Sequence, residues 1–486
     1  MSVKVVYVDI APNAAEDASV SATGSDSKST LALLPFGANN AKEYATLETN
    51  LWTLDGAKTV YDGGNISFWS ASLSNDNGVF TTPPVITITF DEQYTSLGLT
   101  IMFGGDTYCN AITIAWYQGS TLLSSKDFAP DAMQYYCENT VNSYNKIVIT
   151  LRKTALPRRR AKLDKLVFGV ERVFFRDELR RVQLTEEIDV TGREIPANAM
   201  DWVLSSKEDV SYIFQFKQPV KVYDGDELFG IYYVDKADRD DENLYDIICT
   251  DAIGVLDSYD WTDAYYSNQN AAILIRSICA GFDVEIDDSL ASKTVTGVIK
   301  DKTRRGALQQ VCFAIGAIAD TSHSDAIRIF PLDDSESKEV PEDRTRVGSR
   351  VEDEKPVTSV WLTYHSYSTT QSANAESIVI GNTTYYDTKA IKVIDNPNVT
   401  ASDRPNIIKV EDAYLVTSAN KDAIAQLLYD MSMKTRKHKL KFRVVDEKMG
   451  EYLETVTPWG NTHEGFYSHA TVTLSGFALA DAEVTI

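Results

Sequence analysis

The 486-residue sequence has no apolar run that approaches the length of a membrane span. Residues 313–319 are a typical apolar stretch of this sequence, a short run of the kind that is buried in a globular core. The first residues, MSVKVVYVDIAP, lack the basic start and long apolar core of a signal peptide and reach Asp9 at once. We therefore expect neither membrane insertion nor a cleaved leader.

Cysteine is scarce, and the five cysteines are far apart in sequence: Cys109, Cys137, Cys249, Cys279 and Cys312. Zinc or redox spacings are absent, and an odd number argues against a disulfide framework. Cys109 and Cys137 are free to meet in the folded chain, but buried free thiols are the simpler expectation. The pattern fits synthesis in a reducing compartment.

Positive charge is also in short supply. The sequence has 47 Lys and Arg against 70 Asp and Glu, a net charge of −23. An acidic surface repels phosphate backbones and anionic lipids, so we expect no sequence-specific nucleic-acid binding. The basic run Arg158-Arg159-Arg160 could attract an anionic polymer or a partner's carboxylates, but three arginines beside a strand end are more often charge that discourages strand pairing at an edge.

Sequence signatures of catalysis are missing: GxSxG, GxxxxGK[ST], GxGxxG and the EF-hand loop do not occur. His463-Glu464 begins an HExxH string, but Tyr467 stands where the second zinc ligand is needed. We expect no enzyme, no cofactor and no metal centre, although spacing alone leaves open a Cys–His peptidase. An acidic cluster at a predicted hairpin tip is compatible with calcium, but solvated charge is the ordinary explanation at such a position; the cluster comprises Asp238, Asp240, Asp241 and Glu242.

What the sequence does contain is alternation with the period of a β-strand. In residues 85–90 (VITITF), Ile86, Ile88 and Phe90 share one face of a strand. Similar alternation recurs in residues 3–10, 97–103, 112–116 and 147–151, and residues 11–30 read as a long loop or flexible arm. Many short strands between polar loops predict a sandwich or jelly roll up to about residue 170.

The second half mixes strands with a few helices. A hairpin is predicted over 229–251 with a charged tip at 235–243, and strands over 360–364 and 469–477. Helical spacing appears in residues 270–282 and 420–434, and again after Thr303, which is a plausible N-cap. Residues 333–356 are charged and contain proline, which predicts a linker or long loop.

Aromatic residues in or next to predicted loops of the first 170 residues are candidates for glycan binding. A sugar ring stacks its apolar face on such side chains while polar neighbours bind its hydroxyls. Packing beneath a loop is the competing interpretation for each of them. The candidates are Tyr61, Trp69, Tyr108, Tyr135 and Tyr136.

Taken together, several stretches resemble tail hub proteins (tail-tip or baseplate) of phages and prophages of Gram-positive bacteria. YATLETNLWTLDG (44–56), FWSASLSNDNGVFTTPPVITITFDE (68–92), SLGLTIMF (96–103) and residues 144–169 resemble a discoidin-like, galactose-binding-type jelly roll. Residues 178–207 and 222–257 resemble the first β-domain of a tail hub, residues 277–317 the α/β part that follows, and PVTSVWLTYHSYS (356–368) the start of the second hub barrel.

The resemblance implies a mainly β, multidomain fold: an N-terminal β-sandwich followed by hub-like β-barrel and α+β domains. The expected divisions are a strand and arm (1–35), a carbohydrate-binding-type jelly roll (36–170), a first hub-like β-domain (171–260), an α/β segment (261–335), and a linker with a second β-region and a helix (336–486). It also implies a structural protein that forms a ring, commonly a homotrimer, at the end of the tail tube.

The partners implied are the tail tube, distal tail and tape-measure proteins, and the location is the tip of a virion tail assembled from subunits made in the host cytoplasm. The jelly roll would bind host-surface glycan or other baseplate proteins. Two alternatives remain at this point: a carbohydrate-binding adhesin of the tail, and a cell-wall hydrolase whose active site leaves no local signature.

Overall fold

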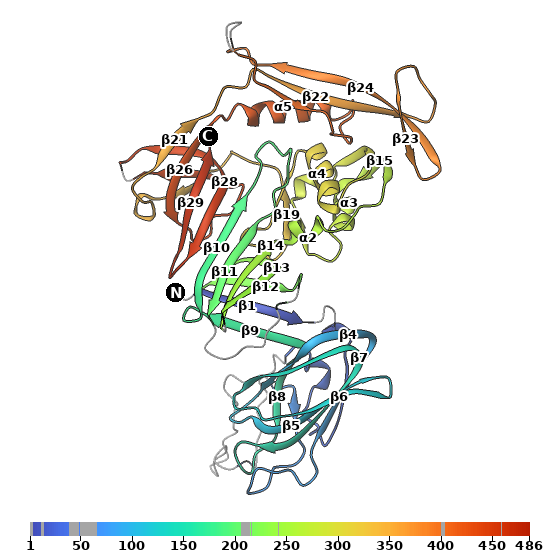
Figure 1. Ribbon diagram of the computed structural model, residues 1–486, viewed down its shortest axis with the longest axis vertical. Coiled ribbons are helices and arrows are strands. Elements are labelled where there is room, and N and C mark those ends of the chain that lie inside the picture. Colours follow the sequence, from blue (N-terminus) through green and yellow to red (C-terminus); the bar gives the residue numbers. More distant parts are fainter. Residues whose placement is uncertain are drawn as a thin grey trace. The chain divides into compact units, whose positions relative to one another are not determined.

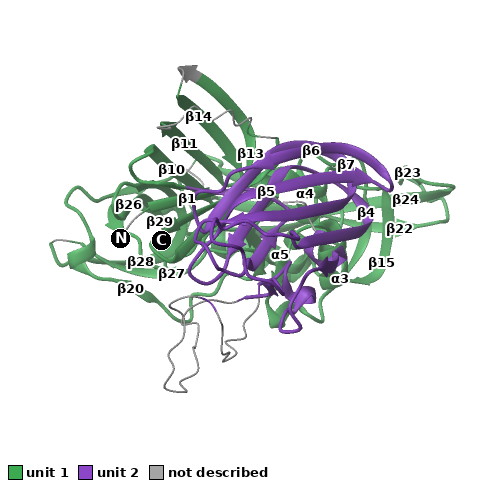
Figure 2. Cartoon of the chain, turned by 90° about the horizontal axis from the view of Figure 1, so that it is seen from below, with its two compact units in different colours: residues 1–6, 174–486 green, residues 7–173 purple. Residues whose placement is uncertain are grey.

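A computed structural model shows a mainly β, multidomain chain, as the sequence predicts. It describes residues 3–10, 14–37, 48, 66–205, 214, 216–241, 243–399, 404–457 and 459–486. Two compact units are present, one of residues 7–173 and one of residues 1–6 with 174–486 (Figure 2). The N-terminal unit is therefore inserted between the first few residues and the rest of the second unit.

The N-terminal unit is built on one antiparallel sheet in the order β3-β8-β4-β7-β5-β6, with β2 added alongside β4 (Figure 1). Its long strands curve around a single apolar core that includes Trp116, Ile149 and Leu163. The strands are β2 (Ser19–Thr23), β3 (Phe68–Trp69), β4 (Val85–Phe103), β5 (Cys109–Gln118), β6 (Thr121–Phe128), β7 (Gln134–Thr154) and β8 (Lys162–Val167).

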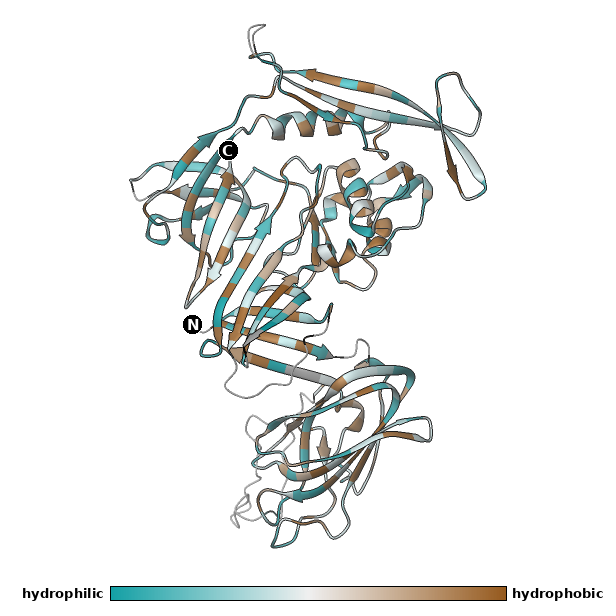
Figure 3. Ribbon diagram, in the orientation of Figure 1, coloured by the Kyte–Doolittle hydropathy of each residue, from teal (hydrophilic) through white to brown (hydrophobic). Residues whose placement is uncertain are grey.

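Strand β4 shows how the sequence pattern produces the sheet. Ile86, Ile88 and Phe90 are buried, as the alternation predicts, and Figure 3 shows such alternation as brown and teal bands along the strands. The two strands predicted over 85–90 and 97–103 are one strand, whose pairing with β7 shifts register between them. At Gly98 a Cβ atom would lie 2.3 Å from the carbonyl oxygen of Cys137, so close pairing there requires glycine.

The predicted flexible arm over residues 11–30 is instead partly ordered against the sheet. It contains the short helix α1 (Ala14–Asp17) and strand β2. The Asp17 carboxylate accepts hydrogen bonds from the backbone amides of Asp91 and Glu92, at 3.1 and 3.0 Å, and from the Tyr94 hydroxyl at 2.9 Å. The Ala- and Ser-rich composition concealed a strand that is held by its neighbour.

The second unit contains a large sheet in which both β-rich regions of the sequence take part. Strand β10 pairs with β11 on one side and with β28 on the other, so Leu184 lies opposite both Met200 and Val472. The order is β21-β26-β29-β28-β10-β11-β14-β13-β12-β1-β9. The strands are β1 (Val3–Ile10), β9 (Gly169–Phe175), β10 (Leu179–Glu187), β11 (Ala199–Ser205), β12 (Pro219–Asp224), β13 (Glu227–Asp241), β14 (Leu244–Thr250), β21 (Arg350–Asp353), β26 (Arg436–Arg443), β28 (Thr462–Leu474) and β29 (Ala478–Thr485).

The structure of this sheet differs from two of the sequence predictions. The segment 333–356, expected as a linker or long loop, contains β20 (Lys338–Val340), which pairs with β27 (Tyr452–Val456), and β21, which pairs with β26. The predicted charged hairpin tip at 235–243 is mostly strand, because β13 continues to Asp241. Pairing with distant strands in the first case, and with the adjacent strand β14 in the second, overrides the local polar composition.

An α/β segment lies between these two β-regions in the sequence. It contains α2 (Ala252–Leu256), α3 (Ala271–Ile278) and α4 (Arg304–Ile315), with β15 (Ala264–Asn270), β16 (Val284–Ile286), β17 (Thr294–Ile299), β18 (Ile318–Asp320) and β19 (Ile327–Phe330). The prediction of Thr303 as N-cap is confirmed, since its hydroxyl accepts the Gly306 amide at 3.1 Å. Asn270 caps α3 in the same way through Ile273.

A separate four-stranded sheet follows, with β22 (Ser359–Ser368), β23 (Glu376–Ile380), β24 (Thr383–Asp395) and β25 (Ile407–Val410) in the order β23-β24-β22-β25. Helix α5 (Lys421–Ser432), predicted over 420–434, packs on one face against Val360 and Leu362. No helix in the described part of the chain has the length and apolar character needed to cross a bilayer.

Candidate functional site

Among the predicted glycan-binding residues, Trp69 is buried. It lies in β3 with only 2% of its surface exposed. The Lys162 ammonium lies 5.1 Å from the centroid of the Trp69 ring. The backbone amide of Trp69 donates a hydrogen bond to the Ser29 hydroxyl at 2.9 Å. A ring enclosed in this way offers no face on which a sugar can stack. Tyr61 lies outside the described residues.

The remaining three candidates are half-buried tyrosines that do not form one platform. Tyr108 packs against Phe103, with ring centroids 6.4 Å apart. Tyr135 and Tyr136 are consecutive on β7, so they point to opposite faces of the sheet. The ring of Tyr135 packs against the core, and burial raises the pKa of its hydroxyl. The hydroxyl of Tyr136 accepts a hydrogen bond from Gln134 at 3.1 Å.

The three arginines at residues 158–160 form ion pairs within the N-terminal unit. Arg158 pairs with Asp76 at 2.5 Å, and Arg159 with Asp106 at 2.8 Å. The Arg160 guanidinium lies 3.3 Å from the Asp26 carboxylate and donates to the Ser70 carbonyl at 2.6 Å. These contacts favour an intramolecular role for the run over attraction of an anionic polymer.

Next to that run lies a buried ion pair that no pattern in the sequence predicts. The Lys162 ammonium lies 2.8 Å from Glu48 and 3.8 Å from Asp106, and the side chains of Lys162 and Glu48 are fully buried. Burial lowers the pKa of Lys162, while the Glu48 carboxylate acts in the opposite direction. Residues 48 and 162 are too far apart in sequence for any local pattern to join them.

The histidines and cysteines do not assemble a catalytic group in the described residues. His463 lies on strand β28, where its ring packs 4.3 Å from that of His438. His365 pairs with Asp387 at 2.7 Å, with both side chains fully buried. All five cysteines are buried free thiols, as expected. Burial raises the pKa of Cys249 and Cys279 to about 12, so neither is a thiolate at neutral pH.

The acidic cluster considered for calcium is not a compact site in the described part of the chain. Asp238 pairs with Lys236 along β13. The side chains of Asp240, Asp241 and Glu242 lie outside the described residues. The described residues contain no group of three His, Cys, Asp or Glu side chains arranged to hold a metal ion.

The second unit contains a buried polar network that joins its segments. Asp320 on β18 accepts from Arg328 and, at 2.6 Å, from Ser322. The Ser322 hydroxyl in turn accepts the backbone amide of Met449 at 3.0 Å. On the other side, the Asn198 amide group donates to Asp320 at 3.3 Å. The first β-region, the α/β segment and the C-terminal strands are thus fixed to one another.

Two further carboxyl groups in this network, those of Glu186 and Asp251, have raised pKa values. Burial raises the pKa of Glu186 to about 8, and nearby Asp320 adds to the shift. Burial likewise raises the pKa of Asp251 to about 6, although Asp251 accepts the Thr321 hydroxyl at 2.7 Å. All three carboxylates are 1% exposed. The network is enclosed, so its role is structural.

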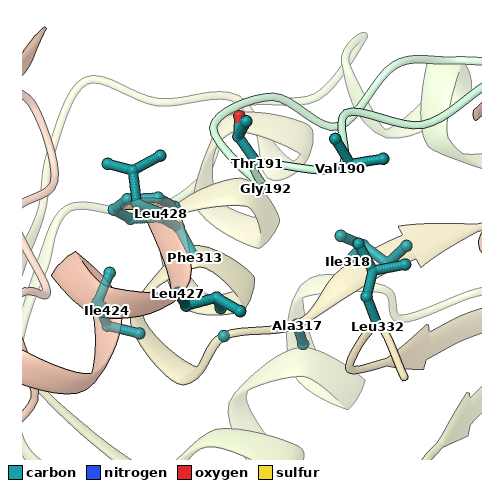
Figure 4. Close-up of a pocket in the computed structure, with 11 residues that line it drawn as sticks. Val190, Thr191, Gly192, Phe313, Ala317, Ile318, Leu332, Ile424, Leu427 and Leu428 are labelled. Carbon is teal, nitrogen blue, oxygen red and sulfur yellow. The ribbon is translucent and has the colours of Figure 1, made fainter. Parts of the chain in front are cut away.

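A small apolar crevice lies where α4 meets α5, near Gly192 (Figure 4). Phe313, Leu427 and Leu428 contribute carbon atoms, and the Thr191 hydroxyl is the one side-chain oxygen drawn in the view. Its volume is about 20 Å³, which is no more than a single water requires. It is a packing gap.

A larger cleft of about 780 Å³ opens beside it. Its walls carry both signs of charge, including Glu194, Lys355 and Glu483. Glu483 is already occupied, with Lys439 at 2.8 Å and Lys437 at 3.6 Å. A wide opening with mixed, mostly paired charges indicates a surface recess and lacks the convergent polar groups of a substrate pocket.

Comparison with known proteins finds similar solved structures at low sequence identity. No protein-family model and no curated protein matches the chain. Among solved structures, a 43 kDa tail protein of prophage MuSo2 from Shewanella oneidensis is 14% identical, with a TM-score of 0.46 over 64% of this chain and 95% of that one. A tail protein from Neisseria meningitidis MC58 is 10% identical, with a TM-score of 0.45 over 65% and 93%. Prophage tail protein gp18 from Listeria monocytogenes EGD-e is 10% identical, with a TM-score of 0.40 over 64% and 90%.

Proposed function

We propose that this chain is a structural hub protein at the tip of a phage tail, where it closes the tail tube as a ring of identical subunits, most simply a trimer. The sequence resemblance to tail hubs supports this role. The observation that carries it is the pairing of β10 with both β11 and β28, which makes one continuous sheet from the two hub-like β-regions. A sheet of this kind is a rigid platform whose edges and faces serve assembly.

One face of the four-stranded sheet suits contact between subunits. Trp361 and Val393 are opposite one another on β22 and β24, and Thr363 and Ile391 form the next pair on the same face. Helix α5 packs on the other face. Ile391 and Val393, two positions apart on β24, remain 54% and 42% exposed, so adjacent aliphatic side chains are available for contact on this face.

In this role the N-terminal unit is an outward module that binds either host-surface glycan or other baseplate proteins. It has its own core and its own sheet, which supports independent folding. A tail adhesin is the second candidate function, because the half-buried Tyr108, Tyr135 and Tyr136 retain some exposure. Glycan-array binding by residues 7–173 would favour that alternative.

Cryo-electron microscopy of assembled tails tests the hub proposal. We expect this chain to form a closed ring on the tail axis, in contact with the tube, distal tail and tape-measure proteins. Peripheral copies outside the axis would contradict the hub role and favour the adhesin.

A variant tests the subunit contact separately. Ile391→Asp with Val393→Asp should prevent incorporation into tails without unfolding the subunit, because two charges would be buried in the contact. Thr388→Asp, at an exposed position of the same strand on the opposite face, is the matched control and should assemble normally. Equal incorporation of both variants would exclude this face.

A further inference from the structure

Two adjoining hollows lie on the α/β segment, and they share no lining residue with the crevice near Gly192 or with the larger cleft beside it. One has a volume of about 130 Å³ and the other about 400 Å³. They share Phe282, Asp283, Asp325 and Ala326, so they form one continuous depression. It is bounded by β13, by the turn after α3 and by the residues that lead into β19.

The floor of the depression is aromatic. Tyr233 of β13 and Phe282 are half-buried and meet edge to face, with ring centroids 5.5 Å apart and planes at 86°. Both rings pack against the apolar core of the α/β segment, which fixes their position. At the adjacent Gly281, no atom lies within 4 Å of the place that a Cβ would occupy, so the space there is open.

The rim is acidic. Asp283, Glu285 and Asp325 are exposed and line the depression, and Arg276 is the one cation among the residues that line it. The Arg276 guanidinium donates to the Val284 carbonyl at 2.9 Å. In the described part of the chain, no lysine or arginine pairs with any of the three carboxylates. The rim therefore has a surplus of negative charge over a fixed aromatic floor.

We propose that this depression is a recognition site for an arginine side chain in a basic segment of a partner protein. A guanidinium is planar, so it stacks on an aromatic ring and donates in a fork to carboxylates at the same time. The aromatic floor and the carboxylates of Asp283 and Asp325 offer both contacts. The net charge of −23 on the chain would further attract a basic segment.

The site goes beyond the hub proposal, because it concerns the partner's side chain and does not depend on the number of subunits in a ring. Lysine fits it less well, since an ammonium lacks the planar fork. A metal ion is a poor alternative, because the described residues do not bring three carboxylates together as ligands.

Titration of the full-length protein with acetyl-Gly-Arg-Gly-amide, followed by saturation-transfer NMR at low salt, tests the proposal. The control ligand is the same peptide with citrulline, which keeps the shape of arginine but has no charge. We expect saturable binding of the arginine peptide with a dissociation constant on the order of millimolar, at least about fivefold tighter than that of the citrulline peptide. Equal binding of the two peptides, or no saturation of the arginine peptide, would overturn the proposal.

Variants locate the binding. Asp283→Asn with Asp325→Asn should weaken binding of the arginine peptide about fivefold or more. Asp412→Asn changes an exposed aspartate outside the depression and should leave binding unchanged. Should the double variant fail to fold, Glu285→Gln alone is expected to weaken binding about twofold. Equal loss in the Asp412 variant, or undiminished binding in the rim variants, would show that the peptide binds elsewhere.

Discussion

In the N-terminal unit the buried Lys162 faces Glu48 and Asp106, whereas the second unit buries Glu186, Asp251 and Asp320, of which Asp320 pairs with the guanidinium of Arg328. In the first cluster an ammonium is matched by a fully buried carboxylate. In the second, acid is in excess, and burial raises the pKa of Glu186 to about 8. Burial is the largest cause of the raised pKa of Glu186, and the neighbouring Asp320 carboxylate raises it further, so this cluster combines burial with an excess of acid.

The largest effect is expected when the balanced cluster loses its cation. Lys162→Met leaves Glu48 buried without its charge partner and should lower the free energy of unfolding of the N-terminal unit by about 3–5 kcal/mol. Urea denaturation of the full chain measures it. Adding Glu48→Leu to Lys162→Met should restore much of the loss, and a double variant no more stable than the single one would contradict the balanced pair.

A second test uses pH on the unbalanced cluster. Between about pH 4.5 and 8 the folded protein keeps a proton on Glu186 that the unfolded chain releases, so stability falls as pH rises through this window. Glu186→Gln should flatten the fall between pH 6.5 and 8, where burial of the ionised form costs on the order of a few kcal/mol. Denaturation midpoints of both proteins across this range give the answer; parallel slopes would mean that Glu186 is ionised in the folded state.

The smallest effect is expected at an exposed pair. Arg158 and Asp76 lie 2.5 Å apart, but both side chains are more than half exposed. Water and salt screen such a pair, so Arg158→Ala should leave the thermal unfolding midpoint of the N-terminal unit unchanged within error. A large loss here would show that short distance alone suffices, and would undo the contrast with Lys162.

Local features of the fold follow from the sequence, and distant ones do not. The alternation in 85–90 and the cap at Thr303 depend on neighbouring residues, and both predictions are confirmed. Trp69 is different: it follows a loop-like pattern, yet Lys162 of strand β8 lies over its ring. The network around Asp320 is likewise formed by residues as distant as Asn198 and Met449.

The depression proposed to bind arginine could not be predicted from the sequence either, because its residues come from separate segments. Phe282 and Asp283 are adjacent, but Tyr233 and Asp325 arrive from other strands and turns. Nothing in the spacing of these residues distinguishes them from core aromatics and surface acids. Only pairing of β16 with β19 brings residues 283 and 325 to one rim.

Because β10 is flanked by β28, the order of synthesis constrains how the chain folds. A ribosome releases β10 long before residues 462–474 exist, so one side of β10 waits as an open edge during translation. Closing it requires contact across most of the chain, which makes this step slow. Premature termination before β28 should therefore yield a product that aggregates, and a cellular protease or chaperone would encounter that edge first.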